Sequence, residues 1–372
     1  MSRRRRDRVR RTSSGAVAAL TIAAAAVAAA ALGAGAASPA AAGAATPLET
    51  LVGARLVVGM QGTTPSAALL DRIRRGRVGG IILMGANVRS APQVRTLTAS
   101  LRAAAREGGR RLLIMTDQEG GLVRRLPWAP PKASAHELGA TSAAHIQAVG
   151  HRAGTALRAA GVNLDLAPVA DVPSSPANFL AAQRRAFSTS RFAVATDTAA
   201  FAQGLEAGRV EPAFKHFPGL GRAGAVSTDE GLVEIGASRR QITRGLLPYQ
   251  VARRRSLHPV VMLSTAVYPA YSPRAAAWSK AIAGTLLRHD LGFKGPTITD
   301  SLTTAAAVRR TGVSVLAVKS AKVGVDLLLI TGPASTSRAA YAAVLREARS
   351  GAIRLASLKA SYARILKLKS RF

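Results

Sequence analysis

Short apolar runs alternate with longer amphipathic segments along most of this chain, and this alternation limits the folds that it can adopt. Eight runs have the length and composition of buried strands: Ala54–Gly59, Gly80–Met84, Arg111–Thr116, Val162–Ala167, Pro212–Phe214, Pro259–Leu263, Pro296–Thr299 and Asp326–Ile330. Between them apolar residues recur at helical spacing, for example in Pro92–Arg106, Ala143–Ala160, Arg191–Gly208, Arg239–Arg254, Trp278–His289 and Arg338–Ala348. Strands that alternate with helices predict a parallel sheet.

The number of such units favours one particular architecture. Eight strand–helix units in about 320 residues fit a (β/α)₈ barrel of the α/β class, which needs about 250 residues plus insertions. A doubly wound open sheet is the competing arrangement. No G-x-G-x-x-G motif follows the first predicted strand, so the nucleotide-binding form of that sheet is disfavoured. We therefore expect residues 46–372 to form a single barrel domain.

The first 45 residues differ from the rest of the chain and indicate export. Residues 3–11 hold seven Arg and one Asp, and an Ala/Val/Leu run extends from Ala16 to Leu32. Small-residue sites such as Ala34-Gly35-Ala36 follow the run. A basic tip, an apolar stretch and a small-residue cleavage site are typical of a signal peptide, so residues 1–45 are excluded from the fold prediction.

An uncleaved N-terminal anchor is the alternative for the same segment. Gly15 to Ala37 comes close to the roughly 20 residues that a membrane-spanning helix requires. In both cases the arginines stay inside and the remainder of the chain lies outside the cytoplasmic membrane. The chain has no cysteine, so an exported domain needs no disulfide formation. The predicted location is secreted or associated with the cell envelope.

The high positive charge raises the question of nucleic-acid binding. Residues 3–11 supply +6 of the formal charge of +33, and the rest of the chain still carries +27. Its Arg and Lys are scattered along amphipathic segments such as Arg72-Ile73-Arg74-Arg75, with few aromatic residues between them for base stacking. The pattern predicts a solvated basic surface that faces an anionic cell envelope, and no nucleic-acid partner.

Ionisable residues follow four of the eight predicted strands. The third run ends in Asp117-Gln118-Glu119, the fourth is followed by Asp171, the fifth ends in Lys215-His216 and the seventh in Asp300. Each alone could cap a helix or end a strand in solvent. In a barrel, however, the carboxyl ends of all strands meet at one face, where active sites are built. Together these residues predict a functional site.

The sequence around these positions resembles glycoside hydrolase family 3, most closely its single-domain bacterial β-N-acetylglucosaminidases. The resemblance runs from about residue 50 to the C-terminus. Two motifs in this order, Asp117-Gln118-Glu119-Gly120-Gly121 and Lys215-His216-Phe217-Pro218-Gly219, are highly specific. The other matching strings are Gly80-Ile81-Ile82-Leu83-Met84 with Asn87, Arg124-Arg125-Leu126, Asn163-Leu164-Asp165-Leu166-Ala167-Pro168-Val169 with Asp171-Val172, Arg185-Ala186-Phe187-Ser188, Leu291-Gly292-Phe293-Lys294-Gly295 and Ile298-Thr299-Asp300-Ser301-Leu302.

The resemblance implies a reaction and a set of residues. It makes Asp300 the nucleophile and the polar set Asp117, Arg125, Arg185, Lys215 and His216 the sugar-binding residues. The implied reaction is hydrolysis of a β-linked terminal sugar with retention, through a glycosyl-enzyme intermediate. The implied substrate is N-acetylglucosamine in peptidoglycan-type glycans. No metal and no organic cofactor is implied.

One departure from the family concerns the proton donor. The N-acetylglucosaminidase branch carries a further His in the Lys-His-Phe-Pro-Gly motif and then an Asp-x-His pair whose His is the acid/base. This chain has no His between His216 and His258. Either Asp229 or Glu230 takes the proton-transfer role, or the loop has lost it and the protein is a weakened barrel that binds cell-wall glycan. A solvated loop pair is the plain alternative for both carboxylates.

Two smaller departures affect neighbours of the site. Ser301 follows Asp300 where the family commonly has a second Asp, and Thr265 follows the sixth strand where the family usually has a His. Both changes bear on substrate preference, and neither removes the expected nucleophile.

Overall fold

The computed structural model describes residues 46–372. The export signal or anchor predicted for residues 1–45 lies outside the described residues. Within the described part, no helix is long and apolar enough to cross a membrane.

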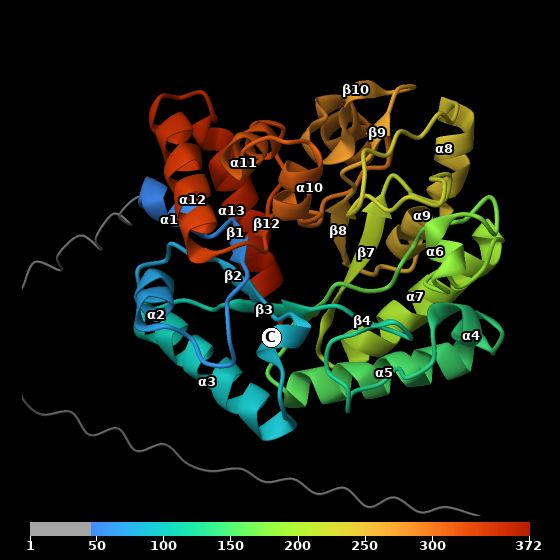
Figure 1. Ribbon diagram of the computed structural model, residues 1–372, viewed down its shortest axis with the longest axis horizontal. Coiled ribbons are helices and arrows are strands. Elements are labelled where there is room, and N and C mark those ends of the chain that lie inside the picture. The colour runs from blue at the N-terminus through green and yellow to red at the C-terminus, as the bar shows by residue number, and fades with distance from the viewer. Residues whose placement is uncertain (1–45) are drawn as a thin grey trace, which may run out of the picture. The chain divides into compact units, whose positions relative to one another are not determined.

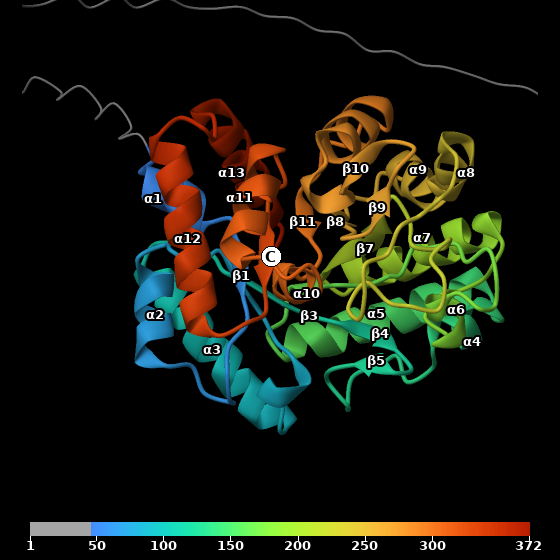
Figure 2. The same cartoon turned by 45° about the horizontal axis from the view of Figure 1, so that its top comes forward.

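Eight parallel strands form a closed barrel at the centre of the domain (Figures 1 and 2). The strand order is β11-β8-β7-β6-β3-β2-β1-β12. The two end strands meet through a parallel bridge between Ile298 and Leu327, so the sheet closes on itself. The barrel strands are β1 (Leu56–Val58), β2 (Gly80–Ile82), β3 (Leu113–Thr116), β6 (Leu164–Asp165), β7 (Glu211–Phe217), β8 (Val260–Leu263), β11 (Thr297–Thr299) and β12 (Leu328–Ile330). The predicted (β/α)₈ barrel is confirmed, and the open doubly wound sheet is wrong.

Helices surround the barrel, and two short hairpins decorate its loops. The helices are α1 (Leu48–Gly53), α2 (Ala67–Arg74), α3 (Ala91–Glu107), α4 (Ala135–Gly139), α5 (Ala143–Ala159), α6 (Phe179–Ala182), α7 (Arg191–Ala207), α8 (Arg239–Gly245), α9 (Leu247–Arg254), α10 (Leu302–Val308), α11 (Val313–Lys322), α12 (Ala334–Arg349) and α13 (Leu355–Lys369). Short 3₁₀ turns are η1 (Gly85–Asn87) and η2 (Ala276–Trp278), and η3 (Lys280–Asp290) is π-helical. The hairpins are β4 (Gln118–Gly120) with β5 (Val123–Arg124), and β9 (Val267–Tyr268) with β10 (Ser272–Ala275).

One predicted helix is divided in the structure. The segment Arg239–Arg254 forms α8 and α9, which meet at Leu246. Pro248 lies in the first turn of α9, where its missing N–H costs nothing. In the middle of one continuous helix the same ring would clash with the carbonyl of Arg244 and remove a hydrogen bond. The proline therefore separates the two helices.

Side chains along the strands alternate between the barrel interior and the helices. Alternate strand positions form one apolar core inside the barrel, comprising Val57, Ile82, Leu113, Met115, Leu164, Leu166, Ala213, Val260, Met262, Ile298, Leu327 and Leu329. The positions between them, such as Leu56, Ile114 and Leu328, join the core beneath the helices. Every second residue of a strand faces the interior, and this alternation continues into the residues that follow the strand. It therefore places Asp117, Lys215 and Asp300 above the inner core.

Helix α13 covers the end of the barrel where the strands begin, opposite to Asp117, Lys215 and Asp300. Its residues Ile365 and Leu368 belong to the inner apolar core. Asp326, which is fully buried just before β12, accepts hydrogen bonds from Ser361 Oγ at 2.6 Å and Arg364 Nη2 at 2.7 Å, both on α13. Arg288 from η3 pairs with the same carboxylate at 2.8 Å. This network anchors the last helix under the amino-terminal ends of the strands.

Candidate active site

A polar pocket of about 210 Å³ opens at the carboxyl ends of the barrel strands. Its floor consists of inward-facing apolar residues, among them Leu166, Met262 and Leu329. Seven of the eight predicted site residues line it: Asp117, Arg125, Arg185, Lys215, His216, Asp229 and Asp300. The structure thus brings together residues that are up to 183 positions apart in sequence.

Lys215 lies between two carboxylates. Its Nζ is 2.7 Å from Asp117 Oδ1 and 2.7 Å from Glu119 Oε1. Glu119 also binds Arg185 through two hydrogen bonds, from Nε at 2.8 Å and from Nη2 at 2.9 Å. This fork-shaped pairing fixes the plane of the guanidinium group. The two cations are therefore held rigidly beside the pocket.

Electrostatics keep Glu119, Lys215 and Arg185 ionised. Burial alone would raise the pKa of Glu119, but Arg185 and Lys215 outweigh it and hold that pKa at about 2. Burial would likewise lower the pKa of Lys215, but Asp117 and Glu119 raise it above its usual value. The pKa of Arg185 is also raised, since Glu119 outweighs the effect of burial. Lys215 and Arg185 are thus charged at neutral pH.

His216 is oriented by the buried Asp171. Asp171 Oδ2 accepts from the His216 ring at Nδ1, at 2.7 Å, and from the His216 backbone N–H at 3.2 Å. The other oxygen, Oδ1, accepts from the Leu220 N–H at 2.6 Å, which ties down the following loop. Gly219 turns that loop with a φ of +133°, a conformation that side chains rarely allow. Because Nδ1 is occupied, the Nε2 edge of His216 is the one free to meet a ligand.

Asp300 directly follows β11 and is the next inward-facing position after Ile298. Its backbone N–H donates to the Leu263 carbonyl at 2.9 Å, which continues the pairing with β8. Its Oδ1 accepts from the Ser301 N–H at 2.7 Å. Ser301 caps α10 through the Thr304 N–H and lies 2.9 Å from Thr331 Oγ1. The carboxylate is therefore held on a rigid strand end, and Ser301 connects β11 to the loop after β12.

The loop after β7 brings one residue of the Asp229–Glu230 pair to the pocket. Asp229 lines the pocket, whereas Glu230 is exposed to solvent and is not among the lining residues. Although Asp229 remains open to solvent, the surrounding protein and the nearby Asp300 carboxylate raise its pKa. Of the pair that the sequence left open, only Asp229 is placed for chemistry in this pocket.

Thr265 lies outside the pocket lining. It is buried after β8, and its carbonyl accepts a hydrogen bond from Arg309 Nη2 at 2.7 Å. The position where the family usually has a His thus contributes to loop structure here.

Three residues that matter for the geometry of the site are absent from the predicted catalytic and sugar-binding sets. Glu119 is the shared counter-ion of Lys215 and Arg185, and Asp171 orients His216. Asp165 is fully buried below them, and its Oδ1 accepts from the Gln118 N–H at 2.9 Å. Burial, together with the negative charges of Asp117 and Glu119, raises the pKa of Asp165 to about 8. The sequence did contain a signal for them: Glu119 lies two residues after Asp117, and Asp165 and Asp171 lie within and just after the matching string Asn163–Val169.

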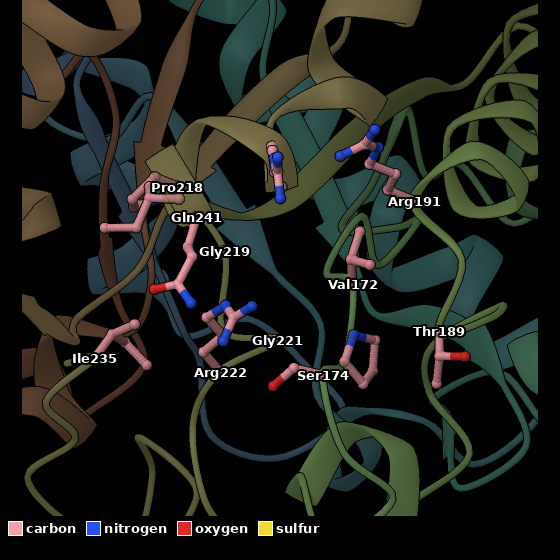
Figure 3. Close-up of a pocket in the computed structure, with 14 residues that line it drawn as sticks. Val172, Ser174, Thr189, Arg191, Pro218, Gly219, Gly221, Arg222, Ile235 and Gln241 are labelled. Atoms are coloured by element: carbon pink, nitrogen blue, oxygen red, sulfur yellow. The ribbon is translucent and has the colours of Figure 1, made fainter. Parts of the chain in front are cut away.

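A second pocket, of about 330 Å³, lies along the same loops (Figure 3). It is lined by residues after β6, such as Val172 and Ser174, and by Gly219 and Arg222 after β7. It contains neither a carboxylate nor a His, so acid–base chemistry is confined to the first pocket of the two. Among the described residues no group of three or more His, Asp or Glu side chains could hold a metal ion.

A closed barrel with cationic and carboxylate groups gathered at its carboxyl face has the features of a glycoside hydrolase. Comparison with known proteins agrees: residues 51–368 match the model of the glycosyl hydrolase family 3 N-terminal domain. The chain belongs to this family and is a glycosidase.

Individual relatives are similar over nearly the whole barrel. A protein from the fungus Arthroderma benhamiae, named an uncharacterized secreted glycosyl hydrolase, is 33% identical over 88% of this chain and 94% of its own length. The β-N-acetylhexosaminidase from Beutenbergia cavernae has a TM-score of 0.80 and 33% identity over 88% of this chain and 99% of that chain. A family 3 β-N-acetylglucosaminidase from Paenibacillus sp. strain FPU-7 has a TM-score of 0.83 and 31% identity over 88% of this chain. This chain spans 63% of the length of the Paenibacillus protein.

Proposed function

We propose that the protein hydrolyses a terminal β-linked N-acetylhexosamine with retention, through a glycosyl-enzyme intermediate on Asp300. The observation that carries the proposal is the presence of Asp300 and Asp229 in one pocket, where Asp300 helps to raise the pKa of Asp229. A fixed carboxylate beside a carboxyl group of raised pKa is the pair that retaining hydrolysis requires. The names of the Paenibacillus and Beutenbergia relatives support the choice of sugar.

The reaction takes two steps. In the first, Asp300 attacks the anomeric carbon while Asp229 gives its proton to the departing glycosidic oxygen. This step breaks the bond from the anomeric carbon to that oxygen and forms an ester with Asp300. In the second, the Asp229 carboxylate takes a proton from a water molecule, whose oxygen attacks the same carbon. The ester bond to Asp300 breaks, and the enzyme returns to its starting state.

The remaining pocket residues hold the sugar in this proposal. Asp117 accepts hydrogen bonds from hydroxyl groups, and Lys215 and Arg185 donate to them. Arg125 adds a further donor, since its Nε is buried without a hydrogen-bond partner among the described residues. His216 presents its Nε2 edge. Because Glu119 already fixes Lys215 and Arg185, little side-chain entropy is lost when sugar binds.

We further propose that the substrate is a peptidoglycan-type glycan outside the cytoplasmic membrane. The basic tip and apolar stretch within residues 1–45 support export, and the Arthroderma relative is named as secreted. The charge of +27 after residue 11 favours contact with an anionic envelope surface.

A comparison of two aryl glycosides tests the proposal. The full-length protein is assayed with an aryl β-N-acetylglucosaminide beside an aryl β-glucoside, together with Asp300→Ala and, as a matched control, Asp290→Ala at an exposed site. We expect turnover of the first substrate, about 10³-fold or more lower in Asp300→Ala and unchanged in the control. A 2-fluoro glycoside should label the peptide that contains Asp300. Sugar binding without turnover would instead make the protein a weakened, glycan-binding barrel, and labelling of another residue would refute the role of Asp300.

A further inference from the structure

A cavity of about 370 Å³ lies at the end of the barrel opposite the active site. It is bounded by Val78 and Gly79 before β2, by Arg111 and Leu112 before β3, and by the last turns of α13. All these segments lie at the amino-terminal ends of the strands, whereas the active-site pocket lies at their carboxyl ends. The two cavities share no lining residue.

Most of the wall of this cavity is apolar. Ile73, Val78, Leu112 and Ile365 line it and are each at least 95% buried. If each non-hydrogen atom takes about 30 Å³, the cavity holds on the order of ten such atoms. This is the volume of a medium-length alkyl chain. Pockets of this size with few polar groups are typical small-molecule sites.

The cavity wall also contains one little-exposed amine. Lys369, near the end of α13, lines the cavity and is only 7% exposed. Within residues 46–372 its Nζ has no hydrogen-bond or ion-pair partner, and it keeps some contact with the space of the cavity. The other titratable groups that line the cavity are Arg110, Arg111 and Tyr362, and none of them carries a negative charge at neutral pH. No carboxylate of the cavity wall balances the amine.

An ammonium that is so little exposed and has no carboxylate beside it is less favourable than one in water. The group then either loses its proton or acquires an anion. Burial, and to a lesser extent the charge of Arg110, lower the pKa of Lys369 to about 7. Near neutral pH the amine is therefore close to half protonated, and a bound anion would shift it to the charged form.

Arg110 and Arg111 each already use one guanidinium nitrogen in hydrogen bonds to backbone carbonyls. Arg110 Nη1 donates to the Arg74 carbonyl at 3.1 Å, and Arg111 Nη1 donates to the Lys369 carbonyl at 3.1 Å. They contribute positive potential at the rim, and Arg111 holds the end of α13 in place. Lys369 is the lining cation that keeps all its donors for a ligand.

We propose that this cavity binds a monocarboxylate with an unbranched apolar chain of about ten carbons, with the carboxylate on Lys369 and the chain along the apolar wall. Charge complementarity selects an anionic head, and the wall selects an apolar tail. The proposal is independent of the reaction at the other end of the barrel.

Calorimetric titration with decanoate tests the site directly. The intact protein is titrated with decanoate and with decanol, which has the same chain and no charge. Lys369→Met keeps the length of the side chain and removes the amine, and Lys367→Met is the control, since Lys367 is exposed on the same helix. We expect decanoate to bind at least about tenfold more weakly to Lys369→Met than to wild type or to Lys367→Met. Equal affinity in all three proteins, or equal affinity for decanoate and decanol in wild type, would overturn the proposal.

A proton count gives a second readout that does not depend on the variant. At pH 8.5 the free amine is mostly neutral, so decanoate should bind with the uptake of close to one proton. At pH 5.5 the amine is already charged, so uptake should be close to zero and affinity higher. Titrations in buffers of different ionisation enthalpy measure this number. Binding without proton uptake at pH 8.5 would place decanoate elsewhere on this basic protein and refute the site.

Discussion

Lys215 Nζ and Glu119 Oε1 lie 2.7 Å apart, and each side chain is only 3% exposed. This buried pair forms the base of the proposed sugar site. Taking two charges out of water is costly, and the cost is offset only when both are fully paired. Arg185 and Asp117 complete the pairing, so the network is stable as a unit. The same network places donors on one side of the pocket before any sugar arrives.

Replacing Glu119 with Gln should destabilise the protein, because it leaves Lys215 with Asp117 as its one carboxylate partner and Arg185 with the neutral Gln183 side chain. The expected loss in the free energy of unfolding is about 3–5 kcal/mol at pH 7, measured by urea denaturation. Glu107→Gln is the control, since Glu107 pairs with Arg74 at the surface and its loss should cost at most about 1 kcal/mol. Equal losses in the two variants would contradict the role of the buried network.

The pH dependence of the Glu119 variant follows from the low pKa of the carboxyl group. That pKa is about 2 in the folded protein, against an ordinary value of 4.5. The stability contributed by Glu119 is therefore complete above about pH 4.5 and is lost as the pH falls toward 2. Glu119→Gln lacks a group that titrates there. Its stability should thus fall less steeply than that of wild type between pH 5 and 3.

Asp171→Asn should weaken catalysis through His216. An Asn side chain has one acceptor oxygen, so it cannot serve His216 Nδ1 and the Leu220 N–H together as Asp171 does. We expect kcat/KM to fall roughly 10–100-fold, by analogy with the loss of a partner that orients a metal-ligating His. In a His216→Ala background the same change should have little further effect. An undiminished effect there would show that Asp171 acts through the loop at Leu220.

The barrel could be predicted from the sequence because of how its strands are buried. Strands that are covered on both faces give continuous apolar runs, and all eight runs contain or overlap a barrel strand. The exact ends of a strand depend on which residues hydrogen-bond to its neighbours, and this cannot be read from the apolar run. For example, β6 is only Leu164–Asp165, within a predicted run of six residues. The division at Leu246 was missed, although Pro248 is the residue that requires it.

The positions of the site residues were predictable, and their partnerships were not. The strand ends indicate Asp117, Lys215 and Asp300, because the carboxyl ends of barrel strands converge. The choice of Glu119 as the partner of Lys215 joins residues 96 positions apart and depends on side-chain directions in the folded loops. Lys369 reads as an ordinary helix lysine, since only the docking of α13 under the barrel buries it.

Asp165→Asn should make stability less dependent on pH. The pKa of Asp165 is raised to about 8, so the stability associated with its protonated form is complete below the ordinary value of 3.8 and is lost as the pH rises through 8. The Asn side chain retains an acceptor for the Gln118 N–H and does not titrate. Between pH 5 and 8 the stability of the variant should improve relative to wild type by on the order of 3 kcal/mol, measured by urea denaturation. Asp71→Asn, at an exposed ion pair, should show no such change.

Asp229→Asn should separate substrates by their leaving group. If Asp229 protonates the departing oxygen, an aglycone that leaves poorly loses about 10²–10⁴-fold in rate, whereas a dinitrophenyl glycoside, which leaves without a proton, loses little from the first step. Because the acid must be protonated, wild-type kcat/KM should fall as the pH rises through the raised pKa of Asp229, and this limb should vanish in the variant. Glu230→Gln is the matched control, one position along the loop and outside the pocket lining, and should behave as wild type. A uniform small effect of Asp229→Asn on both substrates, with the alkaline limb retained, would show that the proton comes from another group.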